Sequence, residues 1–184
     1  QRYGETIPHL CYKPEPGYRA DGNCRACMVE IEGERVLAAS CLRSPSEGMV
    51  ITSANSERAQ SSRKMVMELL ATDQPDRAES PDKSSHFWAM ADLLAVDASQ
   101  ARFDETEKPC ADNSSKAMRV NLQSCINCNL CVRACREVQV NDVIGMAHRG
   151  AESKIVFDFD DPMGDSTCVN CGECVQACPT GALM

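Results

Sequence analysis

A repeated cysteine motif constrains this 184-residue chain more than any other feature. The spacing C-x2-C-x2-C-x3-C occurs twice, first at Cys125, Cys128, Cys131 and Cys135 and again at Cys168, Cys171, Cys174 and Cys178. Four further cysteines form an upstream pattern, C-x12-C-x2-C-x13-C, at Cys11, Cys24, Cys27 and Cys41. Of the thirteen cysteines, Cys110 alone lies outside these sets. A chain with such spacings is expected to fold around bound metal.

The repeated motif has the spacing of bacterial ferredoxins with two [4Fe–4S] clusters. In that pattern three cysteines in a tight loop bind one cluster, and the fourth, on the following helix, binds the other cluster. The spacing therefore predicts two interleaved ligand sets, which are Cys125, Cys128, Cys131 and Cys178 for one cluster and Cys168, Cys171, Cys174 and Cys135 for the other. A pair of zinc sites is the alternative, but the spacing is crowded for separate tetrahedral Zn²⁺ ions.

The upstream set, Cys11, Cys24, Cys27 and Cys41, favours a [2Fe–2S] centre. Its spacing is not that of plant-type ferredoxins, yet it has a central C-x2-C and lies among Gly-containing loops. Backbone N–H groups in such loops can donate hydrogen bonds to cluster sulfurs. A zinc site with four cysteines is the alternative for this set.

Composition excludes several classes of function. Clustered rather than dispersed cysteines, without an apolar signal segment, disfavour a secreted disulfide scaffold and favour a reducing cytoplasmic compartment. No apolar run approaches the roughly 18 residues that span a bilayer, so no membrane association is expected. A net charge of −8 disfavours binding to nucleic acid or to anionic lipid. We therefore expect protein partners.

The pattern of turns and apolar residues predicts an α+β chain with three parts. Residues 1–52 form a β-rich unit, with a hairpin of 28–31 and 35–38 around Gly33 and a further strand at 49–52. Residues 53–117 form a helical connector, with one helix capped by Ser53 or Ser56 and a second short helix over 87–95.

Residues 118–184 form the third part, which contains the repeat. Each cysteine loop is expected to continue as a short helix, over 132–138 in the first copy and 175–178 in the second. Between the copies, residues 142–147 and 154–159 are expected to pair as strands. The simplest arrangement is a twofold-repeated β/α unit around two metal centres.

The apolar positions Met65, Val66, Leu69 and Leu70 fall at the spacing of one helix face in the connector. The remaining polar candidates have a structural and a functional interpretation each. Cys110 is interpreted as a bystander thiol, and His86 as a structural or solvated side chain. The arginines beside the cysteines either raise the reduction potentials of the clusters or are solvated; they are Arg25, Arg43, Arg133 and Arg136. No phosphate-binding glycine loop and no Ser/His/Asp set is present in the sequence, so no catalytic site is expected.

The runs IPHLCY (7–12), GNCRACMVE (22–30) and ASC (39–41) resemble a known iron–sulfur family. It is shared by the large iron–sulfur subunit of respiratory NADH dehydrogenase, the diaphorase small subunit of NAD-reducing hydrogenases, iron-only hydrogenases and molybdenum formate dehydrogenases. The runs CVRACREVQ (131–139), NDVIG (141–145) and CPTGAL (178–183) are most similar to the α subunit of soluble NAD-dependent formate dehydrogenases.

The resemblance implies a β-grasp [2Fe–2S] domain, a connector and a ferredoxin-like domain with two [4Fe–4S] clusters. It also implies departures from the family. The opening hairpin of the β-grasp and the molybdopterin domain that follows the PTGAL segment are absent, which suggests a fragment of a longer polypeptide. Many relatives have Asn-His-Pro and then an H-x3-C-x2-C-x5-C cluster site, where this chain has Asp73, Gln74 and Pro75 and no cysteines.

By this resemblance the chain is an electron-transfer module with one [2Fe–2S] and two [4Fe–4S] clusters. It would relay electrons from formate oxidation at a molybdenum cofactor domain to a flavin/NAD diaphorase subunit. The equivalent subunit of an NAD-reducing hydrogenase or an NADH dehydrogenase is the alternative. A zinc-stabilised interaction scaffold is the alternative from a different class.

Overall fold

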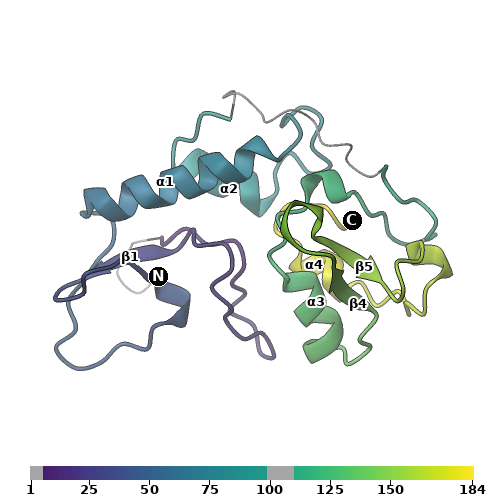
Figure 1. The fold of residues 1–184 in the computed structure, drawn as a ribbon, viewed down its shortest axis with the longest axis horizontal. Coiled ribbons are helices and arrows are strands. Elements are labelled where there is room, and N and C mark those ends of the chain that lie inside the picture. Colours follow the sequence, from purple (N-terminus) through teal and green to yellow (C-terminus); the bar gives the residue numbers. More distant parts are fainter. Residues whose placement is uncertain (1–5, 99–109) are drawn as a thin grey trace.

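The computed structural model describes residues 6–98 and 110–184. Figure 1 shows two lobes connected by two helices. We call residues 6–56 the upstream unit, residues 57–98 the connector and residues 110–184 the downstream unit. Each lobe contains one small antiparallel sheet and one group of cysteine loops, so the sequence repeat and the upstream set fold into separate lobes.

The upstream unit is built on a three-stranded sheet with the order β2-β1-β3. Its strands are β1 (Met28–Ile31), β2 (Ala38–Ala39) and β3 (Ile51–Thr52), and both pairings are antiparallel. Alternate residues of β1, Val29 and Ile31, point inward and form a small core with Ala38.

The expected hairpin partner at 35–38 is displaced, because β2 starts only at Ala38. The turn itself forms as predicted: Gly33 has a φ of +83°, and the amide of Glu34 donates to the Ile31 carbonyl over 3.0 Å. After that turn Val36 is 54 % exposed. Because Val36 is exposed, adding it to the β-ladder would bury little apolar surface. Pairing therefore begins at Ala38 and Ala39, which are buried.

The first connector helix, α1 (Glu57–Thr72), begins at the predicted cap, Ser56. The Ser56 hydroxyl accepts from the Ala59 amide over 3.1 Å and donates to the Glu30 carboxylate over 2.5 Å. The cap thus satisfies an amide that lacks an intrahelical partner and also ties α1 to β1.

The buried face of α1 differs from the apolar positions visible in the sequence. It is formed by residues four apart, which are Ala59, Arg63, Met67 and Ala71, whereas Met65 and Leu69 are more than half exposed. The reason is Arg63, whose guanidinium donates to the Met28 carbonyl and to the Ser53 hydroxyl. A charged residue in the buried row conceals that row from a search for apolar periodicity.

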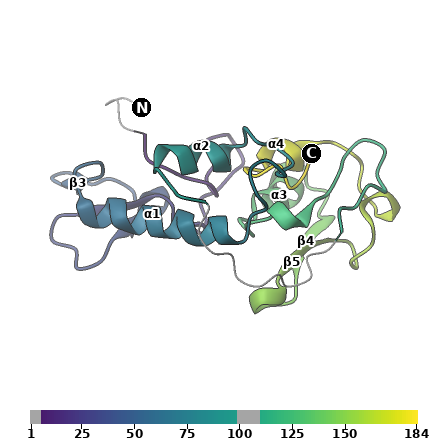
Figure 2. The ribbon, with the colours of Figure 1, turned by 90° about the horizontal axis from the view of Figure 1, so that it is seen from above.

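The second helix, α2 (His86–Leu93), packs with α1 around a core of its own. The buried members are Leu10, Ala26, Met67, Ala71, Phe87, Trp88, Met90 and Ala91. Two of them, Leu10 and Ala26, flank the upstream cysteines. The Phe87 amide also donates to the Pro179 carbonyl over 2.8 Å, which brings α2 against the end of the downstream unit (Figure 2). The connector therefore holds one cysteine group on each side.

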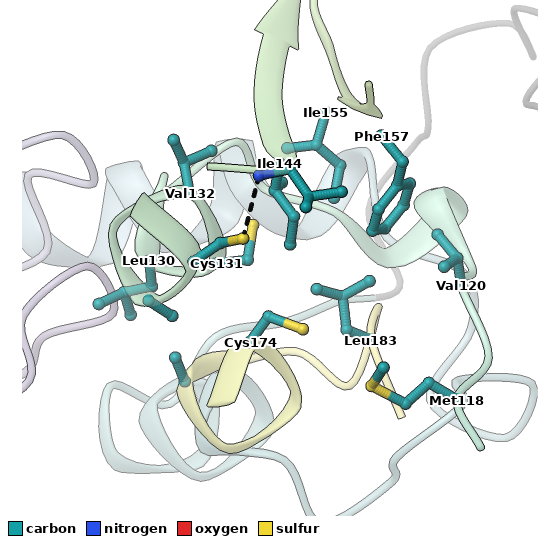
Figure 3. Packing of buried hydrophobic residues seen from close by; sticks show 14 of the residues in the cluster. Met118, Val120, Leu130, Cys131, Val132, Ile144, Ile155, Phe157, Cys174 and Leu183 are labelled. Carbon is teal, nitrogen blue, oxygen red and sulfur yellow. Dashed lines mark hydrogen bonds between the residues drawn. The ribbon is translucent and has the colours of Figure 1, made fainter. Parts of the chain in front are cut away.

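The downstream unit pairs β4 (Ile144–Ala147) with β5 (Lys154–Phe157), with Ile144 opposite Phe157. The first cysteine loop continues as α3 (Leu130–Arg133) and then as a π-helical turn over Ala134–Val138, and the second continues as α4 (Glu173–Ala177). The predicted helices are thus present, but each begins two residues earlier than expected, and the second ends at Ala177. Figure 3 shows that Ile144, Ile155 and Phe157 pack with Leu183, Cys131 and Cys174.

Candidate iron–sulfur centres

The two copies of the cysteine motif fold into the same loop. In the first copy Asn127 and Asn129 have left-handed backbones, with φ of 52° and 63°. In the second copy Asn170 and Gly172 have φ of 56° and 78° at the matching positions. Asparagine and glycine tolerate this region best, so the residues between the cysteines are those that such a loop needs. The loop geometry is therefore encoded locally, twice.

A first hollow, of about 320 Å³ including its open mouth, is lined by four cysteines from both copies. They are Cys125, Cys128, Cys131 and Cys178. Burial raises the pKa of the Cys125 thiol to about 11 and that of Cys128 to about 12, and the nearby Cys178 contributes to both shifts. Three cysteines of the first loop and the last cysteine of the second copy thus lie around one space.

A second hollow, of about 290 Å³, has the reciprocal lining. Its cysteines are Cys135, Cys168, Cys171 and Cys174. Burial, followed by the neighbouring Cys168 and Cys171 thiols, raises the pKa of Cys174 to about 12. The structure therefore places Cys135 with the second loop and Cys178 with the first.

Backbone amides point at the sulfur atoms in both hollows. Sγ of Cys125 accepts from the Asn127 amide over 3.4 Å, and Sγ of Cys168 accepts from the Asn170 amide over the same distance. The Val143 amide, at the start of the chain segment that leads into β4, donates to Sγ of Cys135 over 3.3 Å. N–H groups that donate to sulfur stabilise negative charge on a thiolate and on a bound cluster.

The four upstream cysteines also lie together. Sγ of Cys27 and Sγ of Cys41 are 3.5 Å apart, and the Cys24 amide donates to Sγ of Cys11 over 3.4 Å. A hydrogen bond from the Cys24 thiol lowers the pKa of Cys11 to about 7, whereas burial raises that of Cys41 to about 11. A hydrogen bond from the Gly22 backbone offsets part of that rise in the pKa of Cys41.

The donor set suits polynuclear iron–sulfur clusters. Thiols whose pKa is raised by burial stay neutral unless a positive metal core stabilises their thiolate forms. Within residues 6–98 and 110–184, no three His, Cys, Asp or Glu side chains converge closely enough to hold a single metal ion. The eight downstream cysteines instead surround two hollows.

The long loop between Cys11 and Cys24 joins the upstream unit to the downstream unit. The Tyr18 hydroxyl donates to the Glu173 carboxylate of α4 over 2.7 Å, and burial together with that bond raises the pKa of the phenol. The Asn23 side-chain amide donates to the Cys128 carbonyl over 3.2 Å. Cys11 itself belongs to the hydrophobic core of the downstream unit. The loop is thus an inter-unit contact.

Sequence reasoning did not identify Asn23 or the buried state of Arg133 as features of this contact. Arg133 is 2 % exposed and donates to the Cys11 carbonyl. The one sequence signal for burial was that Arg133 stands between two apolar residues, Val132 and Ala134, which are both buried. That signal is weak, because neighbouring residues of a helix point in different directions and a charged one usually faces solvent.

Three other residues considered in the sequence, Cys110, His86 and Gln74, do not line the hollows. Cys110 is exposed, as a bystander would be. His86 donates from Nε2 to the His9 carbonyl over 2.7 Å, with the two rings 4.9 Å apart, and so has a structural contact. Gln74, in place of the family histidine, is buried and donates to the Ser124 carbonyl over 3.2 Å.

These loops, hollows and sheets define a protein of the ferredoxin-like iron–sulfur class. Comparison with known families agrees: residues 1–56 match the 2Fe-2S iron-sulfur cluster binding domain, and residues 124–182 match the 4Fe-4S dicluster domain. The chain is a small mixed α/β structure that contains both types of ferredoxin-like domain.

The curated relatives are named as subunits of a hydrogenase and of NADH-quinone oxidoreductases. NADP-reducing hydrogenase subunit HndD of Solidesulfovibrio fructosivorans is 33 % identical over 97 % of this chain and 31 % of its own length. An NADH-quinone oxidoreductase subunit of Mycobacterium bovis is 32 % identical over 86 % of this chain and 20 % of its own length. The chain thus spans about a third or less of the curated relatives it matches.

A solved structure has the same fold over nearly the whole chain. A chain of NAD+-reducing [NiFe]-hydrogenase in the H2-reduced state matches with a TM-score of 0.86 and 26 % identity. The match covers 99 % of this chain and 76 % of that one. The iron–sulfur domains of this chain are therefore homologous to those of the matched NADH-quinone oxidoreductase subunit and of NAD-reducing hydrogenase subunits. In the described part of the chain, no helix has the length and hydrophobicity to traverse a bilayer.

Proposed function

We propose that this chain is an electron-transfer module with one [2Fe–2S] and two [4Fe–4S] clusters. The observation that carries the proposal is the lining of the two downstream hollows, each with three cysteines of one motif copy and the last of the other. In this proposal Cys125, Cys128, Cys131 and Cys178 hold one cubane, and Cys168, Cys171, Cys174 and Cys135 hold the other. Cys11, Cys24, Cys27 and Cys41 hold the [2Fe–2S] cluster.

Bound clusters of these types accept and release single electrons. The chain's own residues supply the conditions for this. Amides of Asn127, Asn170 and Val143 donate to cysteine sulfur, and burial of Cys128 and Cys131 limits access of water. The interleaved ligands keep the two [4Fe–4S] sites next to each other, which short-range electron transfer requires. No bond-making step is assigned to this chain.

For the parent enzyme we propose an NAD-dependent formate dehydrogenase. The support is the resemblance of residues 131–139, 141–145 and 178–183 to its α subunit. The partners would be a molybdenum-containing catalytic domain and a flavin/NAD-binding diaphorase subunit, in the cytoplasm, with neither nucleic acid nor membrane. The domain limits would be 1–52, 53–117 and 118–184. The second candidate is the equivalent subunit of a hydrogenase or an NADH dehydrogenase, which the names of the relatives favour.

Metal and sulfide analysis of the anaerobically purified protein tests the electron-transfer proposal. About ten iron and ten acid-labile sulfide per chain would support three clusters. Stoichiometric zinc without sulfide would overturn the proposal in favour of the zinc scaffold. The parent enzyme is tested separately with the native complex. Formate should reduce the clusters, as detected by electron paramagnetic resonance (EPR). Reduction by H₂ or NADH but not by formate would select the second candidate.

Single substitutions test the interleaved ligand sets. Cys178→Ser should damage the cluster of Cys125, Cys128 and Cys131, and Cys135→Ser should damage the other one. EPR spectra of the reduced variants, recorded against Cys110→Ser as the matched control, report which cluster changes. If Cys178→Ser perturbs only the cluster of its sequence neighbours Cys168, Cys171 and Cys174, the interleaved assignment is wrong.

A further inference from the structure

Arg133 is the largest of the fully buried side chains, and it lies at the contact between the upstream and downstream units. Its Nη2 donates to the Cys11 carbonyl over 2.8 Å and to the Cys128 carbonyl over 3.4 Å. Its Nη1 donates to the Arg19 carbonyl. One guanidinium therefore links the backbone of a ligand proposed for the [2Fe–2S] cluster to that of a ligand proposed for a [4Fe–4S] cluster.

The charge of Arg133 is compensated by Asp21, which comes from the loop between Cys11 and Cys24. Nε of Arg133 is 3.2 Å from Oδ2 of Asp21, and the other oxygen of that carboxylate lies 2.6 Å from Nη1 of Arg19. Arg19 in turn pairs with Glu137 of the π-helical turn over 3.0 Å. Positive and negative side chains alternate along this network, which runs from the downstream unit to the upstream unit and back. Among its four members, only Arg133 is almost completely withdrawn from water.

A buried guanidinium has to be explained, because its desolvation costs several kcal/mol unless the charge and the N–H donors are satisfied. A leucine or methionine would fill the same space on α3 at no such cost. The partners of Arg133 show what the arginine adds. It joins two cysteine backbones across the contact through a rigid planar donor group, and it brings a positive charge close to both.

We propose that Arg133 is a positioning residue that joins the upstream cluster site to the site lined by Cys128 and raises the reduction potentials of both clusters. The inference rests on the proposed function, since it assumes clusters at both sites. The proposal also states which [4Fe–4S] cluster is the neighbour of the [2Fe–2S] cluster: it is the one held by Cys125, Cys128, Cys131 and Cys178. A positive charge favours the reduced, more negative state of a nearby cluster, so its loss lowers the potential.

Two variants with opposite charge effects test the electrostatic part. Arg133→Gln leaves Asp21 without its buried partner, so the midpoint potentials of the [2Fe–2S] cluster and of the Cys128 cluster should both fall. Asp21→Asn leaves the guanidinium less compensated, so both potentials should rise. EPR-monitored redox titration of the intact protein measures each potential. Arg136→Gln is the matched control, because Arg136 is exposed and pairs with Asp142; it should leave the [2Fe–2S] potential unchanged.

Arg133→Lys separates charge from positioning. The ammonium keeps the charge but cannot donate to both carbonyls and to Asp21 in one plane. The potentials should therefore stay near the wild-type values, while the magnetic coupling between the reduced [2Fe–2S] cluster and its neighbour should weaken, as measured by pulsed EPR. Arg133→Gln should weaken the coupling too.

The outcomes are distinguishable from a failure of the proposed function. If the wild-type protein holds no iron and sulfide, the electron-transfer proposal fails. If iron and sulfide are present, but Arg133→Gln and Asp21→Asn leave the [2Fe–2S] potential unchanged or shift it in the same direction, the electrostatic role of Arg133 is overturned. Unchanged magnetic coupling in Arg133→Lys overturns the positioning role. If Arg133→Gln fails to fold, Asp21→Asn decides the electrostatic question and Arg133→Lys the positional one.

Discussion

The upstream and downstream units solve the same problem, a set of buried thiols, in different ways. The core of the downstream unit contains the candidate ligands Cys128, Cys131, Cys135 and Cys174 next to its apolar side chains. The upstream unit's own core consists of Val29, Ile31 and Ala38. Two of its cysteines, Cys11 and Cys24, pack against the cores of other parts of the molecule. The difference teaches that one unit is organised around its candidate ligands, whereas the other depends on contacts with the rest of the molecule.

Size explains the difference. A unit of about fifty residues buries too little apolar surface to be stable alone, so it needs metal, disulfides or a partner. In the upstream unit, Cys11 belongs to the downstream core, and Leu10 and Ala26 belong to the core of the connector. Cys24 touches both of these cores. The candidate [2Fe–2S] site is therefore supported mainly from outside its own sheet.

Removal of iron should give the largest effect and should act mainly on the downstream unit. Anaerobic treatment with a chelator should lower the hydrogen-exchange protection of β4 and β5 by about a hundredfold or more, because metal binding contributes to folding where the ligands form the core. The protection of α1, whose buried face packs on apolar residues, should fall much less. Equal losses in α1 and in β4–β5 would show that the downstream core depends on metal no more than the connector does.

Shortening Met67 should destabilise the connector without loss of a downstream cluster. The side chain is fully buried between α1 and α2, so Met67→Ala should cost about 2–5 kcal/mol in local unfolding free energy, measured by exchange of the α1 amides. Met65→Ala is the matched control on the same helix. Because Met65 is 58 % exposed, its truncation should change stability by no more than about 0.5 kcal/mol. A larger cost at Met65 would indicate an unrecognised contact.

Removal of the α1 cap should have a smaller effect on local stability, confined to the end of α1 that contacts the upstream unit. Ser56→Ala removes an acceptor for the Ala59 amide and a donor to Glu30, so it should cost about 1 kcal/mol in the same exchange measurement. Ser61→Ala, at an exposed position within the helix, is the control and should be neutral or slightly stabilising. We expect the iron content of both variants to match the wild type.

The smallest expected effect is a pH dependence at His86. Burial lowers the pKa of its imidazole, with a smaller contribution from the facing His9 ring, so the folded protein prefers the neutral form. The contribution of the neutral His86 imidazole to the free energy of unfolding is complete above the pKa of the unfolded state, about 6.5. It is lost as the pH falls toward the lowered pKa of the folded state.

His86→Gln, which keeps a donor for the His9 carbonyl, should therefore lose less stability than the wild type between pH 7 and pH 6. Thermal unfolding of the anaerobic protein at a series of pH values measures this. His148→Gln, at an exposed position, should follow the wild type. A steeper loss in His86→Gln than in the wild type would contradict the assigned direction of the shift.

Much of the fold follows from local signals, and the errors have physical causes. The Ser56 cap, the turn at Gly33 and the pairing of β4 with β5 are confirmed. The position of β2 was wrong, because pairing depends on which residues the rest of the molecule buries. The buried face of α1 could not be found from apolar spacing, because Arg63 occupies one of its positions.

The sequence by itself predicted the type of metal site and the grouping of the downstream cysteines. Both depend on short-range properties: ligands two or three residues apart, and Asn or Gly where the loop needs a left-handed backbone. Only the tertiary structure decided which loops of the two units meet and that Arg133 is buried between them. Such contacts join residues more than a hundred positions apart, so local sequence patterns do not reveal them.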